Sequence, residues 1–318
     1  MGFFRFIKNW ARHDANIKHM LNDERKSVNE LQATLDEIRV QQKIDYLRDK
    51  TLNSKEAGIS NEKYADFEII VSLTSFGKRI YDVHLAIESI MQGTLKPNRI
   101  VLWLSEQEFG GKTLPKTLEM QRKRGLDIRF CEDVRSYTKL IPALQTFPEA
   151  CIITIDDDLI YEYDIVERLV NSHRKNPKDI CACRIHKIAL DENGKPESYL
   201  KWKWGVDEYG DSKSLYFPTG VGGVLYPPQC FTEEVFNKYV FMDICPYADD
   251  VWFYAMGQLN GTNVTHTYTN KPGGYFWNLP SSAIEALSAR NTNEEDCYND
   301  VQIKAVFEKY KLYERIKM

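Results

Sequence analysis

The sequence predicts an α/β fold in which helices cover both faces of a mostly parallel sheet. From about residue 67, short β-prone apolar runs alternate with amphipathic stretches of helical period. Such alternation is typical of repeated strand–helix–strand units, which build a parallel sheet covered on both sides. The fourth apolar run also ends in three adjacent acids, Asp156, Asp157 and Asp158. Because ligands of such sheets bind beyond the carboxyl ends of the strands, these acids mark the first candidate site.

The elements of this domain are expected at short spacing along the chain. Apolar runs rich in β-branched residues predict strands at 67–73, 99–104, 127–131, 151–155 and 180–184. Amphipathic periods predict the intervening helices at 79–92, 115–124, 138–147 and 164–175. Beyond the last of these strands the pattern changes to long loops rich in glycine and aromatic residues, among them Trp202 and Trp204. Such loops commonly carry the substrate side of a site.

The chain ahead of this domain is expected to be helical. Its pattern predicts a helical or coiled-coil arm at 1–50, a linker at 51–66 and the main domain at 67–318. The first turns place aromatic and apolar residues on one face with only basic charges nearby, which suits a helix at a membrane interface; they are Phe3, Phe6, Ile7 and Trp10. Packing of this face on a partner helix is the alternative. Apolar residues then recur at spacings of three and four, which favours a homo-oligomeric coiled coil through 17–45.

The composition argues against several classes of function. A net charge of −4 and a pI near 6.0 disfavour a general nucleic-acid binder, which needs a concentrated basic surface. Seven cysteines without a Cys-x-x-Cys pair fit a reducing compartment. The sequence contains no apolar run of about 18 residues, the length of a membrane span, and no recognisable signal peptide. We therefore expect a cytoplasmic protein, with peripheral contact to the inner face of a membrane through 1–12.

The acidic strand tip at 156–158 is a candidate metal site. Three carboxylates at the end of a buried strand repel one another unless a cation lies between them. Hard oxygen ligands suit Mg²⁺ or Mn²⁺, which commonly bind through one or two carboxylates together with substrate phosphates. The alternative is a solvated acidic turn that caps the next helix, although a single Asp would suffice for a cap.

The turn after the first strand offers groups for a nucleotide and its phosphates. It supplies the hydroxyl of Thr74, a glycine and the cation of Arg79 ahead of a helix. It matches neither a GxxxxGK[ST] nor a GxGxxG loop, so an ordinary turn with Ser75 as the helix cap is the alternative. Lys139 precedes the helix that leads to the acidic strand and is a second candidate phosphate ligand. An exposed lysine at a helix start is the alternative there.

A second acidic pair lies in the loop-rich half. Asp249 and Asp250 open an aromatic-rich helix, where an acid serves either as a helix cap or as a general base for an acceptor hydroxyl. Between the two acidic sites lie Gly222 and Gly223, whose missing side chains let the backbone approach a ligand closely. His266 could reach a metal through its imidazole, although a lone histidine is more often structural.

In this order, the segments resemble the nucleotide-sugar-dependent glycosyltransferases of the GT-A fold, and among them bacterial enzymes of surface-polysaccharide (capsule or lipopolysaccharide) synthesis. The resemblance covers about 67–268 and rests on four segments: SLTSFGKRI, IITIDDD as a DxD motif, GVGGVLYPP, and ADDVWF, which is similar to an acidic EDV motif. It implies a GT-A domain with a nucleotide-sugar half at 67–160 and an acceptor half at 161–318.

The resemblance also implies roles for the matching residues. Asp156 and Asp158, the latter more directly, would hold Mn²⁺ or Mg²⁺ on the diphosphate of the donor, a nucleotide diphosphate sugar, with UDP as the family's preferred nucleotide. Asp250 would be the catalytic base, with Asp249, which stands where the motif has Glu, as the alternative. His266 is the one candidate for a C-terminal metal-binding histidine. The residues expected around the donor are Thr74, Arg79, Lys139, Asp156, Asp157, Gly222 and Gly223.

The implied reaction is of the hexosyltransferase type. A sugar would move to a hydroxyl of a glycan or lipid-linked glycan, with inversion at the anomeric carbon. Two other functions stay open. A magnesium phosphohydrolase with an aspartyl nucleophile also places DxD at a strand end, but Ile160 stands where that motif has Thr or Val, and the motif is expected on the first strand rather than the fourth. A coiled-coil scaffold or calcium-binding lectin would leave the second acidic pair without a role.

Overall fold

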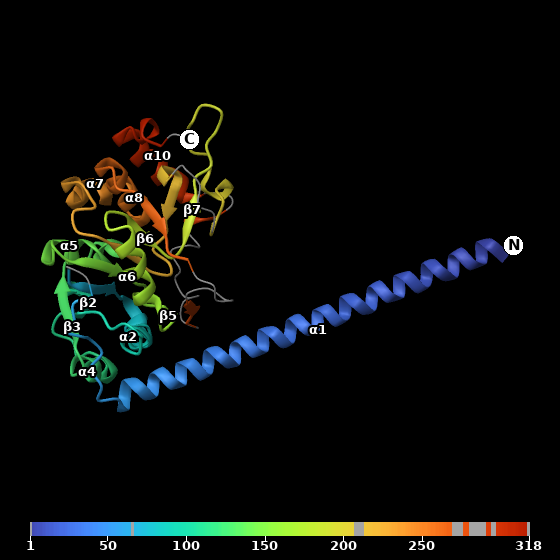
Figure 1. Cartoon of the computed structure of the whole chain (residues 1–318), viewed down its shortest axis with the longest axis horizontal. Helices are drawn as coiled ribbons and strands as arrows, with labels where there is room; N and C mark the ends of the chain where they lie inside the picture. Colours follow the sequence, from blue (N-terminus) through green and yellow to red (C-terminus); the bar gives the residue numbers. More distant parts are fainter. Residues whose placement is uncertain are drawn as a thin grey trace. The chain divides into compact units, whose positions relative to one another are not determined.

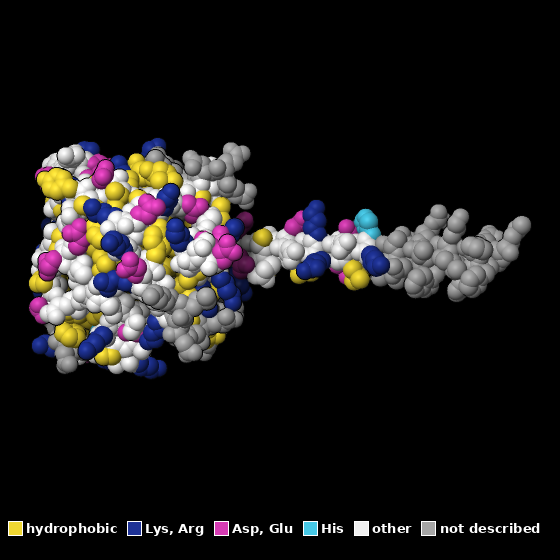
Figure 2. Space-filling view, turned by 90° about the horizontal axis from the view of Figure 1, so that it is seen from above, with side chains coloured by type: hydrophobic (Ala, Val, Ile, Leu, Met, Phe, Trp, Pro, Cys, Tyr) yellow, Lys and Arg dark blue, Asp and Glu magenta, His cyan; other side chains and the backbone are white. Residues whose placement is uncertain are grey.

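Figure 1 shows the computed structural model of the chain, which describes residues 2–64, 67–206, 213–268, 276–279, 291–293 and 297–316, those up to 17 as backbone only. The chain divides into two compact units, residues 1–49 and 50–318. The first unit is part of one continuous helix, α1 (Gly2–Asn53). Where the side chains of this helix are described, exposed apolar groups lie among charged ones (Figure 2). No described helix is long and apolar enough to cross a membrane.

The second unit is built on a seven-stranded sheet with the order β10-β6-β9-β4-β1-β2-β3. These strands are β1 (Ile69–Thr74), β2 (Arg99–Ser105), β3 (Leu126–Cys131), β4 (Cys151–Thr154), β6 (Ile180–Ala182), β9 (Val224–Tyr226) and β10 (Val264–His266). Neighbouring strands are parallel, except that β9 runs antiparallel to both β4 and β6. Two small antiparallel pairs accompany this sheet: β5 (Leu159–Tyr161) with β11 (Phe276–Asn278), and β7 (Ile185–Lys187) with β8 (Tyr216–Pro218).

The described helices of this unit lie between the strands and after them. They are α2 (Val83–Met91), α3 (Glu106–Phe109), α4 (Lys116–Arg122), α5 (Ile141–Thr146), α6 (Ile165–Lys175), α7 (Lys238–Ile244), α8 (Asp249–Asn260) and α10 (Tyr298–Tyr310). Short 3-10 turns are η1 (Gly77–Tyr81), η2 (Arg135–Lys139), η3 (Tyr199–Lys201), η4 (Lys213–Leu215), η5 (Glu233–Phe236) and η7 (Leu312–Glu314). The helix expected at 138–147 is thus divided into η2 and α5, with Pro142 in the first turn of α5, where its missing N–H is not needed.

Both faces of the sheet are covered, because successive strand residues enter two separate apolar cores. On β1, Ile70 belongs to one core and Val71 to the other. Side chains of α5, α8 and α10 pack in the first core, and those of α2, α4 and α6 pack in the second. The predicted α/β fold, a mostly parallel sheet between two layers of helices with a helix ahead of it, is confirmed.

The antiparallel strand β9 brings two distant loops to one edge of the sheet. Thr154 ends β4 and pairs with Val224, which begins β9. The chain therefore leaves β4 at the edge where it enters β9, so the acids at 156–158 adjoin the glycine-rich segment at 220–223. Because β1 lies parallel to β4 on its other side, the turn that follows β1 reaches the same edge.

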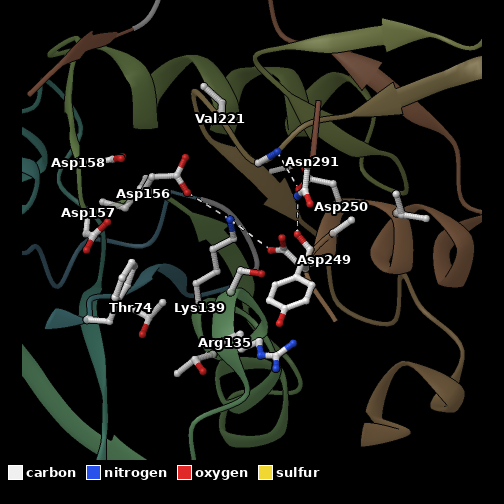
Figure 3. A pocket seen from close by; sticks show the side chains of 18 of the residues that line it. Thr74, Arg135, Lys139, Asp156, Asp157, Asp158, Val221, Asp249, Asp250 and Asn291 are labelled. Atoms are coloured by element: carbon white, nitrogen blue, oxygen red, sulfur yellow. Dashed lines mark hydrogen bonds and ion pairs between the residues drawn. The ribbon is translucent and has the colours of Figure 1, made fainter. Parts of the chain in front are cut away.

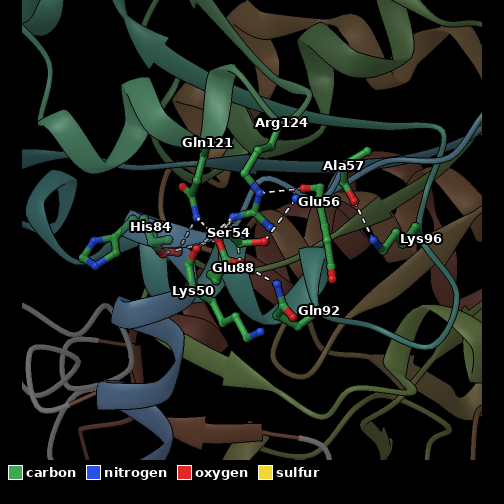
Figure 4. Close-up of polar contacts among 11 residues, drawn as sticks. Lys50, Ser54, Glu56, Ala57, His84, Glu88, Gln92, Lys96, Gln121 and Arg124 are labelled. Atoms are coloured by element: carbon green, nitrogen blue, oxygen red, sulfur yellow. Dashed lines mark hydrogen bonds and ion pairs between the residues drawn. The ribbon is translucent and has the colours of Figure 1, made fainter.

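A buried ion pair joins the start of the second unit to its helices (Figure 4). The Arg124 Nη1 atom lies 2.8 and 2.9 Å from the two carboxylate oxygens of Glu88, and their side chains are only 4% and 0% exposed. Gln121 also donates to Glu88, at 3.0 Å. The same guanidinium donates to the backbone carbonyls of Glu56, at 2.7 Å, and Lys50, at 3.3 Å. The end of α1 and the segment after it are thus hydrogen-bonded to the residue that follows α4.

We predict that Arg124→Met lowers the free energy of unfolding by about 3–5 kcal/mol, because it leaves the Glu88 carboxylate buried without its cation. Urea unfolding of the full chain measures the change. The control is Arg122→Met, which removes an exposed pair with Glu119 and should change the same free energy by less than about 1 kcal/mol. Equal unfolding midpoints for the two variants would contradict the prediction.

Candidate active site

A cavity of about 670 Å³ lies at this edge of the sheet. Its wall includes both acidic segments singled out in the sequence, together with Thr74, Arg79 and Lys139. Figure 3 shows the acids of the β4 tip on one side, the acids that open α8 on the other, and Lys139 extending between them. Two acidic segments almost a hundred residues apart in sequence therefore face one space, as a site shared by two substrates requires.

Lys139 is a buried cation that links the two acidic segments. Its Nζ atom lies 3.2 Å from Oδ1 of Asp156 and 3.3 Å from Oδ2 of Asp249, and its side chain is 12% exposed. Burial alone would lower the pKa of Lys139, but the charges of Asp156 and of the two acids in α8 outweigh it and hold the pKa well above its usual value. The ammonium stays charged, and the alternative of an exposed lysine at a helix start is wrong.

Arg79 holds the other two acids of the β4 tip. One guanidinium nitrogen, Nη1, lies 3.0 Å from Oδ1 of Asp157 and 3.0 Å from Oδ2 of Asp158. Ser75 donates its hydroxyl hydrogen to Asp157 at 2.6 Å and makes no cap for η1, whose N-cap position is Phe76. Burial raises the pKa of Asp157, with Ser75 and Arg79 opposing the shift. Asp157 is nearly fully buried and bonded within the chain, so it orders the acidic turn.

The donor atoms at the β4 tip fit a divalent ion of the magnesium or manganese type. Asp156 and Asp158 offer carboxylate oxygens, the ligands these ions prefer, and burial followed by the charge of Asp156 raises the pKa of Asp158 to about 6. A cation favours the ionised form of such a carboxylate. Among the described residues, no group of three His, Cys, Asp or Glu side chains is arranged to hold a metal ion. An ion here would therefore need ligands from a substrate, as Mg²⁺ commonly takes them from phosphates.

Asp249 and Asp250 occupy the first turn of α8 and do not cap it. The N-cap position is Ala248, without a side-chain hydrogen bond. Asp250 instead accepts the backbone N–H of Gly220 at 2.9 Å. Burial, and then the charge of Asp249, raise the pKa of Asp250 to about 7, against the lowering effect of Lys139 and of the Gly220 N–H. A carboxylate with a pKa near neutrality is suited to general-base catalysis at neutral pH.

The glycine-rich segment reaches the cavity through its first residues, Gly220 and Val221. A Cβ atom on Gly220 would lie 2.8 Å from the Lys139 Nζ atom and 3.0 Å from Oδ1 of Asp250, so a side chain there would displace one of these groups. Gly222 and Gly223 do not line the cavity, and they have φ values of +91° and +102°, which only glycine adopts readily. Their predicted contact with a donor is replaced by a backbone role.

The structure does not bring His266 to the cavity. It lies buried in β10, with its Nε2 atom 3.0 Å from the carbonyl oxygen of Cys183. β10 is the edge strand of the sheet and is separated from β4 by β6 and β9. A metal-binding role for His266 stays a prediction without support from this position.

Several cavity residues had no signal in the sequence. They come from separate segments of the second half and from η2, and include Arg135, Arg184, His186, Tyr199, Trp204, Phe217 and Tyr247. The change to aromatic-rich loops indicated only the region. Neither residue type nor spacing identified the individual side chains, because the sheet edge gathers them from positions more than a hundred residues apart.

Comparisons with known proteins give one structural likeness. No family model matches the sequence, and no curated protein matches it. Among solved structures, the chain is similar to one titled "Crystal structure of S. aureus TarS 1-349", with 12% sequence identity and a TM-score of 0.41. The likeness covers 77% of this chain and 72% of the other. At that identity and TM-score it assigns no activity to this chain.

We predict that Lys139→Met raises the pKa of Asp250 above its value of about 7, because the variant removes a positive charge that favours the carboxylate. Carbon-13 NMR of the side-chain carboxyls as a function of pH measures the shift. Lys112→Met is the control, since Lys112 lies over the ring of Phe109 and does not line the cavity. An unchanged Asp250 titration in the Lys139 variant would show that the two charges are not coupled.

Proposed function

We propose that the protein is a glycosyltransferase of the hexosyltransferase type that acts in surface-polysaccharide synthesis. The donor would be a nucleotide diphosphate sugar, UDP-linked by preference, and the acceptor a hydroxyl of a glycan or lipid-linked glycan. One observation carries the proposal: the acids suited to a metal–diphosphate complex and the acid suited to a base lie in one cavity, linked by Lys139. The resemblance of the four sequence segments to GT-A enzymes supports it.

On the donor side, Asp156 and Asp158 would hold Mn²⁺ or Mg²⁺, and Thr74 and Arg79 lie on the same part of the wall. The ion would neutralise the charge that grows on the departing diphosphate. Lys139 presents an ammonium beside Asp156 and adds positive charge to the same region. Arg79 keeps Asp157 and Asp158 fixed, so the carboxylates meet the donor in one arrangement.

On the acceptor side, Asp250 would remove the proton of the attacking hydroxyl. Its hydrogen bond from the Gly220 N–H fixes the orientation of the carboxylate, and its pKa of about 7 makes it a stronger base than an ordinary aspartate. Asp249 is held by Lys139 and raises the pKa of its neighbour. A base across the cavity from the diphosphate region favours attack on the opposite face of the sugar, which inverts the anomeric centre.

We predict that Asp158→Asn abolishes metal-dependent binding of the donor, because it removes a ligand charge at the β4 tip while keeping the side-chain shape. Thermal unfolding with UDP-glucose, UDP-galactose and UDP-N-acetylglucosamine, each with and without Mn²⁺, is the measurement, since a ligand of the native state raises the melting temperature. The control is Asp82→Asn, which lies outside the cavity. If Mn²⁺ strengthens donor binding equally in the Asp158 variant, Asp158 is not a metal ligand.

We predict that Asp250→Asn lowers kcat by about a hundredfold or more and leaves donor binding intact, as loss of a general base should. In the unaltered protein, kcat should rise with pH through about 7 and level off above it, because the base acts only in its deprotonated form. Steady-state rates with a soluble acceptor measure both effects. Loss of donor binding would reassign Asp250 as a binding residue, and inactivity of Asp249→Asn alone would exchange the two roles.

The helical arm is proposed to join copies of the chain and to bring them to a membrane-borne acceptor. Along α1, exposed apolar residues recur at heptad-like spacing: Leu21, Val28, Leu31, Leu35 and Ile38. The predicted membrane face at 1–12 lies outside the described side chains. An oligomer would multiply weak contacts with a membrane. A cytoplasmic location at the inner face of the membrane follows from this proposal.

We predict that removal of residues 1–49 lowers the oligomeric state and the binding to anionic vesicles, while activity on a short soluble acceptor stays nearly unchanged. Light scattering and vesicle sedimentation measure the two effects separately. Leu31→Lys in the full chain should weaken association, whereas Gln32→Lys, off the apolar stripe, should not. An unchanged oligomer on removal of the arm rules out the coiled coil, and absent vesicle binding by the full chain rules out the membrane contact.

A further inference from the structure

One wall of the cavity, in the half that holds Asp250, presents a rigid aromatic face. The Trp204 ring is stacked on that of His186, with centroids 5.3 Å apart and planes at 4°. The Trp204 indole donates its N–H to the carbonyl of Tyr199 at 3.1 Å, which fixes the orientation of the ring. Tyr199 in turn packs against both Trp204 and Phe217. Trp204 is nevertheless 48% exposed and lines the cavity, so a large aromatic surface is held in place without being covered.

This face is uncharged at neutral pH. The Nδ1 atom of His186 accepts the backbone N–H of Gly205 at 3.1 Å, which a protonated nitrogen could not do. Burial, and then the nearby charge of Arg184, lower the pKa of His186 to about 4. The stack therefore offers apolar area and an electron-rich ring face, the surface on which the C–H groups of a sugar ring pack.

Arg184 places a positive charge beside the aromatic face. Its Nε atom donates to the Thr219 hydroxyl at 2.8 Å, which orients the guanidinium. Its charge contributes to the pKa values of both His186 and Tyr199, which places it next to the stack. Among the described residues, Arg184 forms no ion pair. The cavity cations Arg79 and Lys139 differ in this respect, because each is held by two carboxylates.

We infer that this wall is the acceptor subsite, and that it selects a sugar ring carrying a negative charge: the ring packs on Trp204 and its carboxylate or phosphate group binds Arg184. An oriented guanidinium without a partner carboxylate binds an oxyanion through charge-assisted hydrogen bonds. The inference rests on the proposed function only in naming this ligand the acceptor. Binding of a charged sugar to Trp204 and Arg184 is testable without any transfer reaction.

Three matched probes test the inference by ligand-observed saturation-transfer NMR on the full chain: methyl β-glucoside, methyl β-glucuronide and glucose 6-phosphate. At least one anionic probe should bind about tenfold or more tightly than the neutral glucoside, and the stronger of the two identifies a carboxylate or a phosphate as the group recognised. Arg184→Gln should remove the preference for charge. Arg135→Gln is the matched control, since Arg135 also lines the cavity but lies over the ring of Tyr247.

Trp204→Ala should weaken binding of the preferred probe about tenfold, and Trp204→Phe should restore most of it. Tyr239→Ala removes an aromatic ring that is 88% exposed and lies outside the cavity, and should change nothing. UDP binding should be the same in all these variants. Equal binding of charged and neutral probes, a charge preference that survives Arg184→Gln, or loss of UDP binding in Trp204→Ala would each overturn the inference. A failed proposed function would instead appear as absent metal-dependent binding of UDP-sugars, which the three probes do not measure.

Discussion

The bond network of Lys139 is the interaction on which the site depends. The cavity gathers the acids of the β4 tip and of α8 in a largely buried space, where like charges repel strongly. Lys139 and Arg79 neutralise part of this charge and tie the two acidic segments into one arrangement. The compensation is incomplete, because the pKa values of Asp158 and Asp250 remain raised. A site left with excess negative charge is prepared for an incoming cation on one side and for proton uptake on the other.

The sheet topology creates the distance over which Lys139 acts. If β9 ran parallel to β4, the glycine-rich segment before it would lie at the opposite edge, away from the acids. Its antiparallel course places Gly220 beside Lys139 and lets the Gly220 N–H hold Asp250. One reversed strand therefore converts two separate loops into facing walls. The two apolar cores on either side of the sheet keep those walls fixed, since α8 packs in one and α6, which follows the β4 tip, packs in the other.

The sequence predicted what short-range pattern determines. The strands, the acids at the end of β4 and the acids at the start of α8 follow from local periodicity and polarity, and the structure places both acidic segments in the cavity. It did not predict that Lys139 would pair with both segments, because such a pairing depends on how distant loops meet. Gly222 was interpreted as a ligand contact, whereas its positive φ shows a backbone requirement. Arg184 and Trp204 could not be found, since stacking and missing ion pairs are tertiary properties.

The absence of a side chain at position 220 also bears on how this cavity could be re-engineered. Any Cβ there meets Lys139 and Asp250 at once, so a saturation library at this position would return glycine alone among functional clones. The adjacent Val221 lies on the cavity wall with no such restriction from the backbone, since its φ is not in the left-handed region. Diversity intended to alter the size of the accepted sugar therefore belongs at Val221, with Gly220 held constant.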